Sequence, residues 1–539
     1  MKMLGTNGIR GIANDYMSPE LALRVGKAVA SVMGPGTVAV AKDPRTSSDM
    51  LASSVEAGLM SAGVDVDDLG MVPTPALQYY VKTHEDVVGG VMITASHNPP
   101  EFNGIKCVAE DGTECSHVQE EAIEAAYEKG VKNVGWGSVG ILRRVSGAGE
   151  AYVDAIVSKV DAGAIRGAGL KVCLDCSNGA ASYTSPLLLS KLGVRAVTMN
   201  ATPDGMFPGH ESEPTEEHLK DLSRLVADTG SDLGMAHDGD ADRCVFVTGK
   251  GEYVPGDKSL AILAAQAVSG SPGAKAVTTV ATSKVVEAAV ASAGGKTVYT
   301  AVGSPVVARR MIADGAVVGG EENGGVIFAD HQYCRDGAMA IARMLEAVAL
   351  KGSLEDLVAS LPEFHTVKAA MRCDDSDKKA VMDGIAEMHR GERVDLTDGV
   401  RIDYDHGWVL MRPSGTEPKF RVYAESKDEE AAHELSERFL REAESVRDSL
   451  GKRRRPSLLE RIEGNAGLPL IVPGSEGVVP VALRVQRLEH HLAEPLPYRN
   501  LHRVVGGVVR PQGERPLEAG VDLPEGADDA SSYPGGPEP

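Results

Sequence analysis

The sequence predicts an α/β protein in which helices cover mostly parallel sheets, and two observations carry this prediction. Short apolar runs of β type alternate with segments of helical periodicity along most of the chain, as they do in strand–helix–strand units. The chain also has 539 residues, and at about 150 residues per domain it has room for three or four domains.

The first strand–helix unit lies near the amino terminus. Ser18 and Pro19 form a helix start signal, because serine caps free N–H groups and proline fits the first helical turn. The apolar residues that follow fall on one face, so the helix is expected to pack on a sheet containing residues 38–41. They are Leu21, Val25, Ala28, Val29 and Val32. Similar units recur at 171–192 and 275–293, which places domain boundaries near residues 150, 255 and 365.

The segment 367–450 has a different pattern. Apolar strands are expected at 408–411 and 420–424. The helix after them carries apolar residues on one face, namely Leu435, Phe439, Ala443 and Val446. We expect a smaller α+β domain here.

The composition changes after Lys452. The rest of the chain holds 12 of the 29 prolines and ten arginines but no lysine. Proline and glycine oppose a packed domain, so residues 452–539 are expected to be a disordered tail. A tail of unrelated origin, such as translation past a disrupted stop signal, is the alternative. The basic run 452–455 is interpreted as a solvated linker rather than a polyanion site.

The net charge of −22 argues against partners such as nucleic acid or a membrane surface, since both require concentrated lysine and arginine. Seven cysteines suggest no disulfide framework, and Cys173 and Cys176 lack the second pair that a zinc site needs, so both are expected in the core. No signal-peptide core opens the chain, and no apolar run is long enough to span a bilayer. We expect a cytoplasmic enzyme whose anionic substrate binds in a local basic pocket.

A serine follows the apolar run 91–93 on a short polar turn with the sequence Thr-Ala-Ser-His-Asn-Pro. Phosphoryl transfer asks a protein mainly to position oxygens and neutralise charge, and a phosphorylated Ser96 would be a donor that stays bound. Lys106 is a candidate cation or proton shuttle beside the transferred group. The alternatives are a serine turn that merely closes a strand and an exposed lysine at a strand end.

Three aspartates, Asp238, Asp240 and Asp242, alternate in what we expect to be an extended segment. Their carboxylates would then converge on one side as hard oxygen ligands, which suits Mg²⁺. A calcium EF-hand loop is excluded, because Arg243 and Gly249 replace its sixth-position glycine and its twelfth-position glutamate. Acidic residues on a solvated turn are the remaining alternative, although three close carboxylates repel one another without a cation.

Two further loops have the composition of substrate-binding loops. Glu321 and Asn323 lie between glycines after an apolar strand, where the backbone can approach a sugar and its hydroxyls closely. A later loop offers hydroxyls, backbone N–H groups and guanidinium groups to a phosphate dianion, with an ordinary turn as the alternative. Its candidates are Arg412, Ser414, Gly415, Thr416 and Arg421.

These four loops, together with the opening Gly5-Thr6-Asn7-Gly8-Ile9-Arg10-Gly11, resemble the α-D-phosphohexomutase family, and most of all its archaeal-type phosphoglucosamine mutase branch. The resemblance covers roughly residues 1–450. It implies three similar mixed α/β domains and a smaller α+β domain around a central cleft. The implied domains are 1–150 with the phosphoserine, 151–255 with the metal, 256–365 for sugar recognition and 366–451 for phosphate binding.

The resemblance also implies roles for individual residues. The three aspartates would bind Mg²⁺ together with the phosphate on Ser96, and Arg243 would face the active site. Arg10, expected in the glycine-rich opening turn, would lie at the catalytic centre, with a purely structural arginine as the alternative. Glu321 and Asn323 would read sugar hydroxyls, while the Arg412 loop would hold the phosphate that does not react. Many bacterial relatives end the sugar loop with a histidine proposed as an acid/base, whereas this chain, like the archaeal-type branch, has Gly325. Proton transfer then falls to Lys106, His97, His331 or solvent, and Lys106 is favoured.

We therefore expect a monomeric or homodimeric mutase that interconverts glucosamine 6-phosphate and glucosamine 1-phosphate through phospho-Ser96 and a bisphosphorylated sugar. Glucose and mannose phosphates are the alternative substrates. A phosphatase would instead release inorganic phosphate, and a regulator that only binds sugar phosphates would have an unreactive Ser96.

Overall fold

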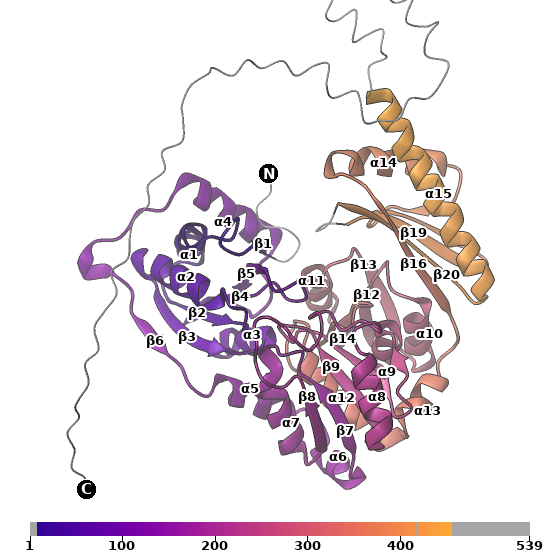
Figure 1. Ribbon diagram of the computed structural model, residues 1–539, viewed down its shortest axis with the longest axis horizontal. Helices are drawn as coiled ribbons and strands as arrows, with labels where there is room; N and C mark the ends of the chain where they lie inside the picture. The colour runs from indigo at the N-terminus through magenta and orange to yellow at the C-terminus, as the bar shows by residue number, and fades with distance from the viewer. Residues whose placement is uncertain (1–7, 415–417, 455–539) are drawn as a thin grey trace, which may run out of the picture. The chain divides into compact units, whose positions relative to one another are not determined.

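The structure, a computed structural model, describes residues 8–414 and 418–454. Within these residues lie four sheets, and we call each sheet with its helices a domain, numbered in chain order (Figure 1). All of them belong to one unit that ends at Arg454. The last helix continues to that residue, so 452–454 are helical and not part of the expected tail. Residues 455–539 lie outside the described residues, as do Gly5, Thr6 and Asn7 of the opening motif.

The first domain has a six-stranded mixed sheet in the order β1-β5-β4-β2-β3-β6. Its strands are β1 (Ile9–Ile12), β2 (Thr37–Lys42), β3 (Asp65–Met71), β4 (Val87–Ile93), β5 (Phe102–Ala109) and β6 (Leu142–Arg144). Its helices are α1 (Pro19–Met33), α2 (Ser48–Ser61), α3 (Thr74–Thr83) and α4 (His117–Lys129). Ser18 accepts a hydrogen bond from the Leu21 N–H, so the predicted cap of α1 is confirmed. Side chains of β2 alternate between two cores, with Val38 packed among α1 and α2 and Ala39 in the cluster that contains α3.

The second and third domains are built in the same way. The second contains β7 (Lys171–Asp175), β8 (Arg195–Met199), β9 (Leu233–His237), β10 (Cys244–Thr248) and β11 (Tyr253–Val254), with α5 (Ala148–Val157), α6 (Ala162–Ala168), α7 (Thr184–Leu192) and α8 (Lys220–Thr229). The third contains β12 (Lys275–Thr279), β13 (Lys296–Thr300), β14 (Val318–Gly320) and β15 (Val326–Phe328), with α9 (Gly256–Val268), α10 (Lys284–Ser292), α11 (Ser304–Asp314), α12 (Gly337–Lys351) and α13 (Leu354–Ala359).

These three sheets repeat one arrangement of four strands. A first strand pairs in parallel with a second strand on one side and a third on the other, and a fourth strand pairs antiparallel with the third. In that order the strands are β2, β3, β4 and β5, then β7, β8, β9 and β10, then β12, β13, β14 and β15. The loop between the third and fourth strands holds Ser96 in the first domain, the three aspartates in the second, and Glu321 with Asn323 in the third. Three of the four candidate loops therefore occupy equivalent places.

One apolar cluster continues through the first three domains. It joins buried residues of α3, α5, α7, α9 and α12. Helix α12 is buried along most of its length, which suits a helix with an apolar face toward more than one neighbour. The shared core fixes the three domains, and hence their loops, against one another.

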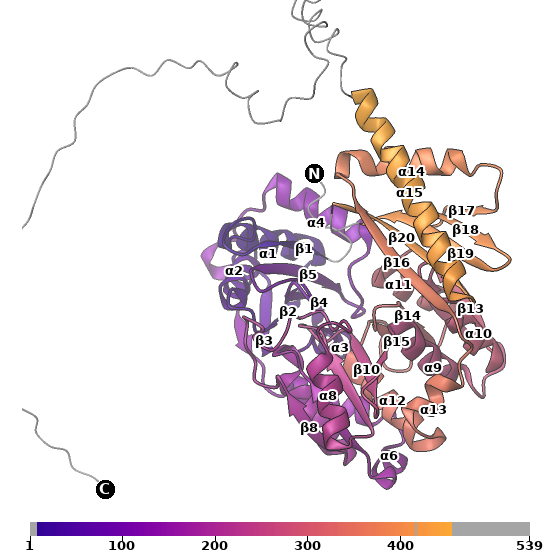
Figure 2. The same cartoon turned by 45° about the vertical axis from the view of Figure 1, so that its right-hand side comes forward.

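The fourth domain is an antiparallel sheet in the order β16-β20-β19-β18-β17, with α14 and α15 packed on it (Figure 2). Its elements are β16 (His365–Arg372), α14 (Asp375–Met388), β17 (Val394–Asp395), β18 (Val400–Tyr404), β19 (Gly407–Pro413), β20 (Lys419–Ser426) and α15 (Glu429–Arg454). The predicted face of α15 is confirmed, since Leu435, Phe439 and Ala443 are buried in this core. Trp408 packs against Val280 and Ala281 of the third domain.

The predicted fold class is thus confirmed, with three similar α/β domains and a smaller α+β domain. All seven cysteines are buried and free, so Cys173 and Cys176 belong to the core as expected. Among residues 8–414 and 418–454, no helix is both long and apolar enough to cross a membrane.

Candidate active site

Ser96 lies on a buried turn directly after β4, as the sequence predicts. Its φ of 53° is in the left-handed region, and its N–H donates to the Thr94 hydroxyl at 2.8 Å, which holds this turn. The Ser96 hydroxyl donates to Oδ2 of Asp238 at 2.9 Å. The serine of the first domain is therefore in direct contact with the aspartate loop of the second.

Arg45, a residue that the sequence analysis did not single out, donates hydrogen bonds to the serine turn. Its buried guanidinium donates to the Ser96 carbonyl at 2.9 Å and pairs with Asp43 at 3.0 Å. It also donates to the carbonyls of Asn98, Pro99 and Phe102. One side chain thus binds four carbonyl groups of the turn. The only sequence signal is an acidic and a basic residue two positions apart after strand 37–42.

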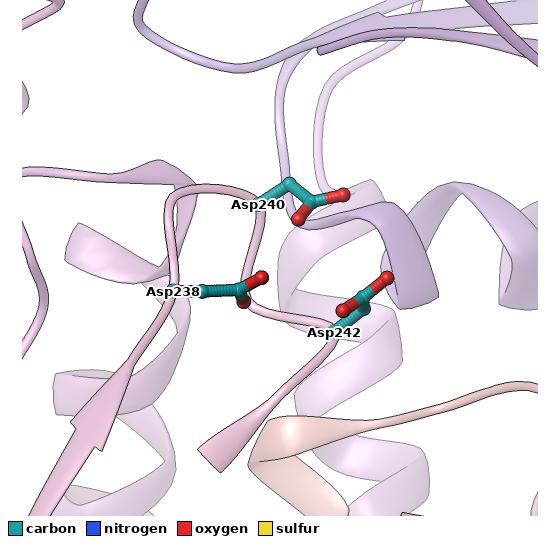
Figure 3. Close-up of side chains that lie close together, drawn as sticks. All are labelled: Asp238, Asp240 and Asp242. Atoms are coloured by element: carbon teal, nitrogen blue, oxygen red, sulfur yellow. The ribbon is translucent and has the colours of Figure 1, made fainter. Parts of the chain in front are cut away.

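The aspartate loop is a tight turn, so the prediction of an extended segment is wrong. Strands β9 and β10 pair antiparallel with His237 opposite Cys244, which forces the chain to reverse within residues 238–243, and Ala241 has a φ of 58°. The carboxylates still converge, because they come from one turn and face a common space (Figure 3). Each offers an oxygen within 4.8 Å of the others.

The three carboxylates are buried, and their pKa values are shifted in different directions. Burial and the neighbouring carboxylates of Asp242 and Asp240 raise the pKa of Asp238 to about 8. Burial also acts to raise the pKa of Asp240, but the Lys106 ammonium at 2.7 Å and the Thr74 hydroxyl at 2.5 Å outweigh it and lower that pKa. The opposite balance applies to Lys106. Burial acts to lower its pKa, but the carboxylates of Asp240 and Asp242 outweigh burial and raise it, so Lys106 keeps its positive charge.

The aspartate turn fits a divalent metal ion. Oδ1 of Asp240 and Oδ1 of Asp242 are buried and accept no hydrogen bond. A buried carboxylate oxygen without a partner is costly, and a hard cation supplies the missing charge and contact. Asp238, Asp240 and Asp242 are therefore the candidate metal ligands.

Two arginines and a histidine lie at the serine turn. Arg10 lies in strand β1, not in a turn as expected, because β1 pairs with β5; its guanidinium donates to Asn98 Oδ1 at 2.8 Å. Arg243 donates to His97 Nδ1 at 3.1 Å, and its Nε is 3.8 Å from Asp238 Oδ2. Burial, followed by the charges of Arg243 and Arg10, lowers the pKa of His97, so this ring is neutral. Its Nδ1 is 3.4 Å from the Ser96 hydroxyl oxygen.

The sugar loop, residues 321–325, turns between β14 and β15. Glu321 is buried and accepts a hydrogen bond from the Gly303 N–H at 3.0 Å, and burial raises its pKa. Asn323 accepts from the Gly325 N–H at 3.1 Å. Between them, Glu322 contributes to a different cavity of about 370 Å³, which Asp257 also lines.

His331, one of the four candidates for proton transfer, lies among other side chains. Its ring stacks on Tyr79 with 5.3 Å between centroids, and Nε2 is 3.3 Å from Asp336. Asp336 caps helix α12 by accepting from the Met339 N–H. The contacts of His331 are thus those of a core histidine.

The phosphate loop follows β19 in the fourth domain. Arg412 and Arg421 are opposite one another in the antiparallel pair of β19 and β20. Arg412 pairs with Asp398 at 3.1 Å, and Asp398 accepts from the Val302 N–H, next to the Gly303 N–H that contacts Glu321. The Ser414 carbonyl accepts from Lys378. The other two predicted residues of this loop, Gly415 and Thr416, lie outside the described residues.

Two more contacts between domains were not visible in the sequence. Thr74, at the start of α3, contacts Asp240 through both its hydroxyl and its backbone N–H. Arg335, from the third domain, bridges Asp242 and Glu321. Neither residue belongs to a motif, and each contact joins segments far apart in the chain.

Comparison with protein families matches nearly all of the described chain. The phosphoglucomutase/phosphomannomutase α/β/α domains I, II and III match residues 1–133, 150–251 and 255–364, and the C-terminal domain matches 369–442. These four consecutive matches define a phosphohexomutase. The chain therefore belongs to the phosphoglucomutase/phosphomannomutase family of α-D-phosphohexomutases, and it is an isomerase that transfers phosphoryl groups.

Individual relatives agree with this assignment. A phosphoglucomutase/phosphomannomutase of Thermococcus kodakarensis is 40% identical over 445 residues, which cover 81% of this chain and 97% of the relative. A probable phosphoglucosamine mutase of Methanopyrus kandleri is 41% identical over 442 residues, with the same two coverages. A crystal structure of a phosphoglucomutase/phosphomannomutase family protein from Burkholderia thailandensis has a TM-score of 0.73 and 27% identity and covers 83% of this chain and 97% of its own.

Proposed function

We propose that this enzyme interconverts glucosamine 6-phosphate and glucosamine 1-phosphate, with Ser96 as the phosphoryl carrier. One observation carries the proposal. The Ser96 hydroxyl, on a strained turn, is 2.9 Å from Asp238 in a cluster of three carboxylates, two of which have a buried oxygen that accepts no hydrogen bond. A buried serine in that position is suited to carry a phosphoryl group whose charge a cation neutralises.

Asp238, Asp240 and Asp242 would hold Mg²⁺ beside the phosphate of Ser96. Oxygen ligands and their negative charge suit this ion, which would stabilise charge on the transferring phosphoryl group. Lys106, Arg243 and Arg10 add positive charge around the same place. An anionic substrate would therefore meet positive charge at this place, although the chain as a whole carries a net charge of −22.

In the first transfer, the bond from phosphorus to the Ser96 oxygen breaks and a bond forms from phosphorus to the free hydroxyl oxygen of the sugar monophosphate. The product is a bisphosphate. After the sugar turns over in the site, its other phosphoryl group passes back to Ser96 and the isomer leaves. Arg412, Ser414, Gly415, Thr416 and Arg421 would hold the phosphate that is not reacting, and Glu321 and Asn323 would contact the sugar hydroxyls.

The sugar hydroxyl loses a proton in this transfer while the leaving Ser96 oxygen takes one up, and the group that accepts the sugar proton must be unprotonated beforehand. Lys106 already carries its proton because Asp240 and Asp242 raise its pKa, so it suits the role of a fixed cation better than that of a base. His331 contacts Asp336 and Tyr79. His97 is neutral and next to Ser96, but burial and the charges of Arg243 and Arg10 lower its pKa and so make it a weak base. Solvent water is therefore the favoured acceptor among the four candidates.

The choice of glucosamine rests on the relatives. Several archaeal relatives that are 37–41% identical carry the name probable phosphoglucosamine mutase, whereas one carries the name phosphoglucomutase/phosphomannomutase. Glucose and mannose phosphates are thus the second candidates.

The test is an isomerisation assay with the 1-phosphates of glucosamine, glucose and mannose in the presence of Mg²⁺, with inorganic phosphate measured in parallel. The highest kcat/KM for glucosamine 1-phosphate supports the proposal, and a higher value for either other sugar overturns the substrate assignment. Accumulation of inorganic phosphate in place of an isomer would indicate a phosphatase. Peptide mapping should find the phosphate on Ser96, and Ser96→Ala should remove most of the turnover.

A further inference from the structure

Arg335 joins two of the candidate loops through one planar group. It lies between β15 and α12, and its side chain is only 4% exposed. One guanidinium nitrogen, Nη2, donates to Asp242 Oδ2 at 2.6 Å, and another, Nη1, donates to Glu321 Oε2 at 3.2 Å. The guanidinium group of Arg335 therefore contacts both the aspartate turn and the sugar loop.

The path of the Arg335 side chain explains the glycine at position 325. A Cβ atom at Gly325 would lie 2.2 Å from Cδ of Arg335 and 3.0 Å from its Cγ. Backbone conformation does not demand this glycine, because Gly325 has no positive φ, whereas its neighbour Gly324 has a φ of 87°. The aliphatic part of Arg335 thus fills the volume that a side chain at 325 would take.

The two hydrogen bonds of Arg335 also orient their acceptors. Oδ2 of Asp242 accepts from Arg335 at 2.6 Å and from Lys106 at 3.3 Å, whereas the other oxygen, Oδ1, accepts no hydrogen bond. Glu321 is likewise held between Arg335 and the Gly303 N–H. Groups that hydrogen-bond to metal ligands fix the ligand's direction and change metal affinity, commonly by 10- to 100-fold.

We propose that Arg335 is a positioning residue for both loops, and that the lack of a side chain at Gly325 leaves the space that Arg335 requires. Through Asp242 it sets the affinity for the divalent cation, and through Glu321 it sets the affinity for the sugar phosphate. The second of these roles rests on the proposed function, whereas the first does not. A permanently charged group is suited to this task, because an arginine does not lose its proton in the working pH range.

The first experiment measures Mn²⁺ binding to the unliganded full-length protein by electron paramagnetic resonance. Arg335→Ala should weaken Mn²⁺ binding by about 10- to 100-fold, and Arg335→Lys, which keeps the charge but not the planar fork, should fall between it and the wild type. Arg310→Ala is the matched control, since Arg310 is an exposed arginine of the same domain that pairs with Asp314. Wild-type Mn²⁺ affinity in folded Arg335→Ala or Arg335→Lys protein would overturn the proposal.

The second experiment is a double-mutant cycle with Gly325→Ala. The added methyl group should weaken Mn²⁺ binding in the wild type, because it displaces Arg335. In the Arg335→Ala background the same change should alter binding by less than about twofold, since the space is then open. Equal effects of Gly325→Ala in both backgrounds would show that the glycine is needed for another reason. Circular dichroism of each variant separates these outcomes from unfolding.

Turnover completes the test. If the wild type isomerises a hexose phosphate, Arg335→Ala should also raise KM for that substrate, and the conservative lysine variant should restore part of the loss. If the wild type isomerises none of the three sugars, the proposed function fails while the Mn²⁺ cycle still decides the role of Arg335.

Discussion

Removing the guanidinium of Arg45 tests whether this side chain positions the serine turn. Arg45→Met keeps much of the aliphatic volume but removes the ion pair with Asp43 and the hydrogen bonds to the carbonyls of Ser96, Asn98, Pro99 and Phe102. Both partners of the ion pair have side chains with no exposed area. The variant therefore removes the cation beside the buried Asp43 carboxyl group and one hydrogen-bond donor from each of the four carbonyls.

The expected magnitude follows from this burial. Removing one partner of a buried ion pair costs about 3–5 kcal/mol. Each 1.36 kcal/mol is a factor of ten, so local opening of the turn should become roughly 150- to 5,000-fold more frequent. Misplacement of a reacting oxygen by about 1 Å can reduce kcat by a factor of about 100, and we expect a loss of at least that order for isomerisation.

Hydrogen–deuterium exchange of the turn gives the direct measurement. The amides of Ser96 and Asn98 donate hydrogen bonds within the turn, so their exchange should accelerate by the opening factor. Amides of β19 in the fourth domain should exchange as in the wild type. The control variant is Arg24→Ala, at an exposed arginine of the first domain, which also contains Arg45. Unchanged exchange at Ser96 and Asn98 with near-normal kcat would refute the positioning role of Arg45.

Four further results are expected. Asp240→Asn should weaken Mg²⁺ binding and slow isomerisation by several orders of magnitude, and full activity in excess chelator would contradict the metal site. Arg412→Ala or Arg421→Ala should raise KM by roughly 10- to 100-fold for a loss of about 1.5–3 kcal/mol, with a smaller effect on kcat in both directions of the reaction. Burial, with a contribution from Glu322, raises the pKa of Asp257 from 3.8 to about 7. The folded protein therefore holds the carboxyl proton of Asp257 more tightly than the unfolded chain does, and it loses stability as pH rises from about 4 to 7. Asp257→Asn avoids that loss, and its Tm relative to the wild type should increase between pH 4.5 and pH 8; a constant difference would exclude this effect. A chain truncated after Lys452 should keep its Tm and activity, because the apolar face of α15 that packs in the fourth domain ends earlier, and an aggregating or inactive product would contradict this.

The sequence was most informative where a feature depends on neighbouring residues. The Ser18 cap, the apolar face of α1 and the polar turn at Ser96 are local, and each was predicted from a few consecutive residues. The aspartates were identified as a group because they lie within one short motif. Their conformation was mistaken, however, since alternating acids fit an extended strand as well as they fit a tight turn.

The residues that support the site could not be found in this way. Arg45 contacts Ser96 across 51 positions, Arg335 contacts Asp242 across 93, and Thr74 contacts Asp240 across 166. The first pair forms only when distant strands of the first domain come together, and the other two form only when separate domains pack. A lone arginine or threonine after a strand has no pattern of its own. Arg10 was placed in a turn for a related reason, because its strand is defined by pairing with β5.

The three repeated hairpins separate chemical tasks along the chain. Paired strands hold the two ends of each connecting loop about 5 Å apart, so the sheet sets where a loop starts and ends while its internal sequence is free to change. The proposed phosphoryl carrier, cation ligands and sugar contacts each lie in a different copy of this hairpin. Substitutions in the third copy can therefore retune which sugar is accepted without disturbing the serine or the aspartates, provided that the bridge between the second and third copies is kept.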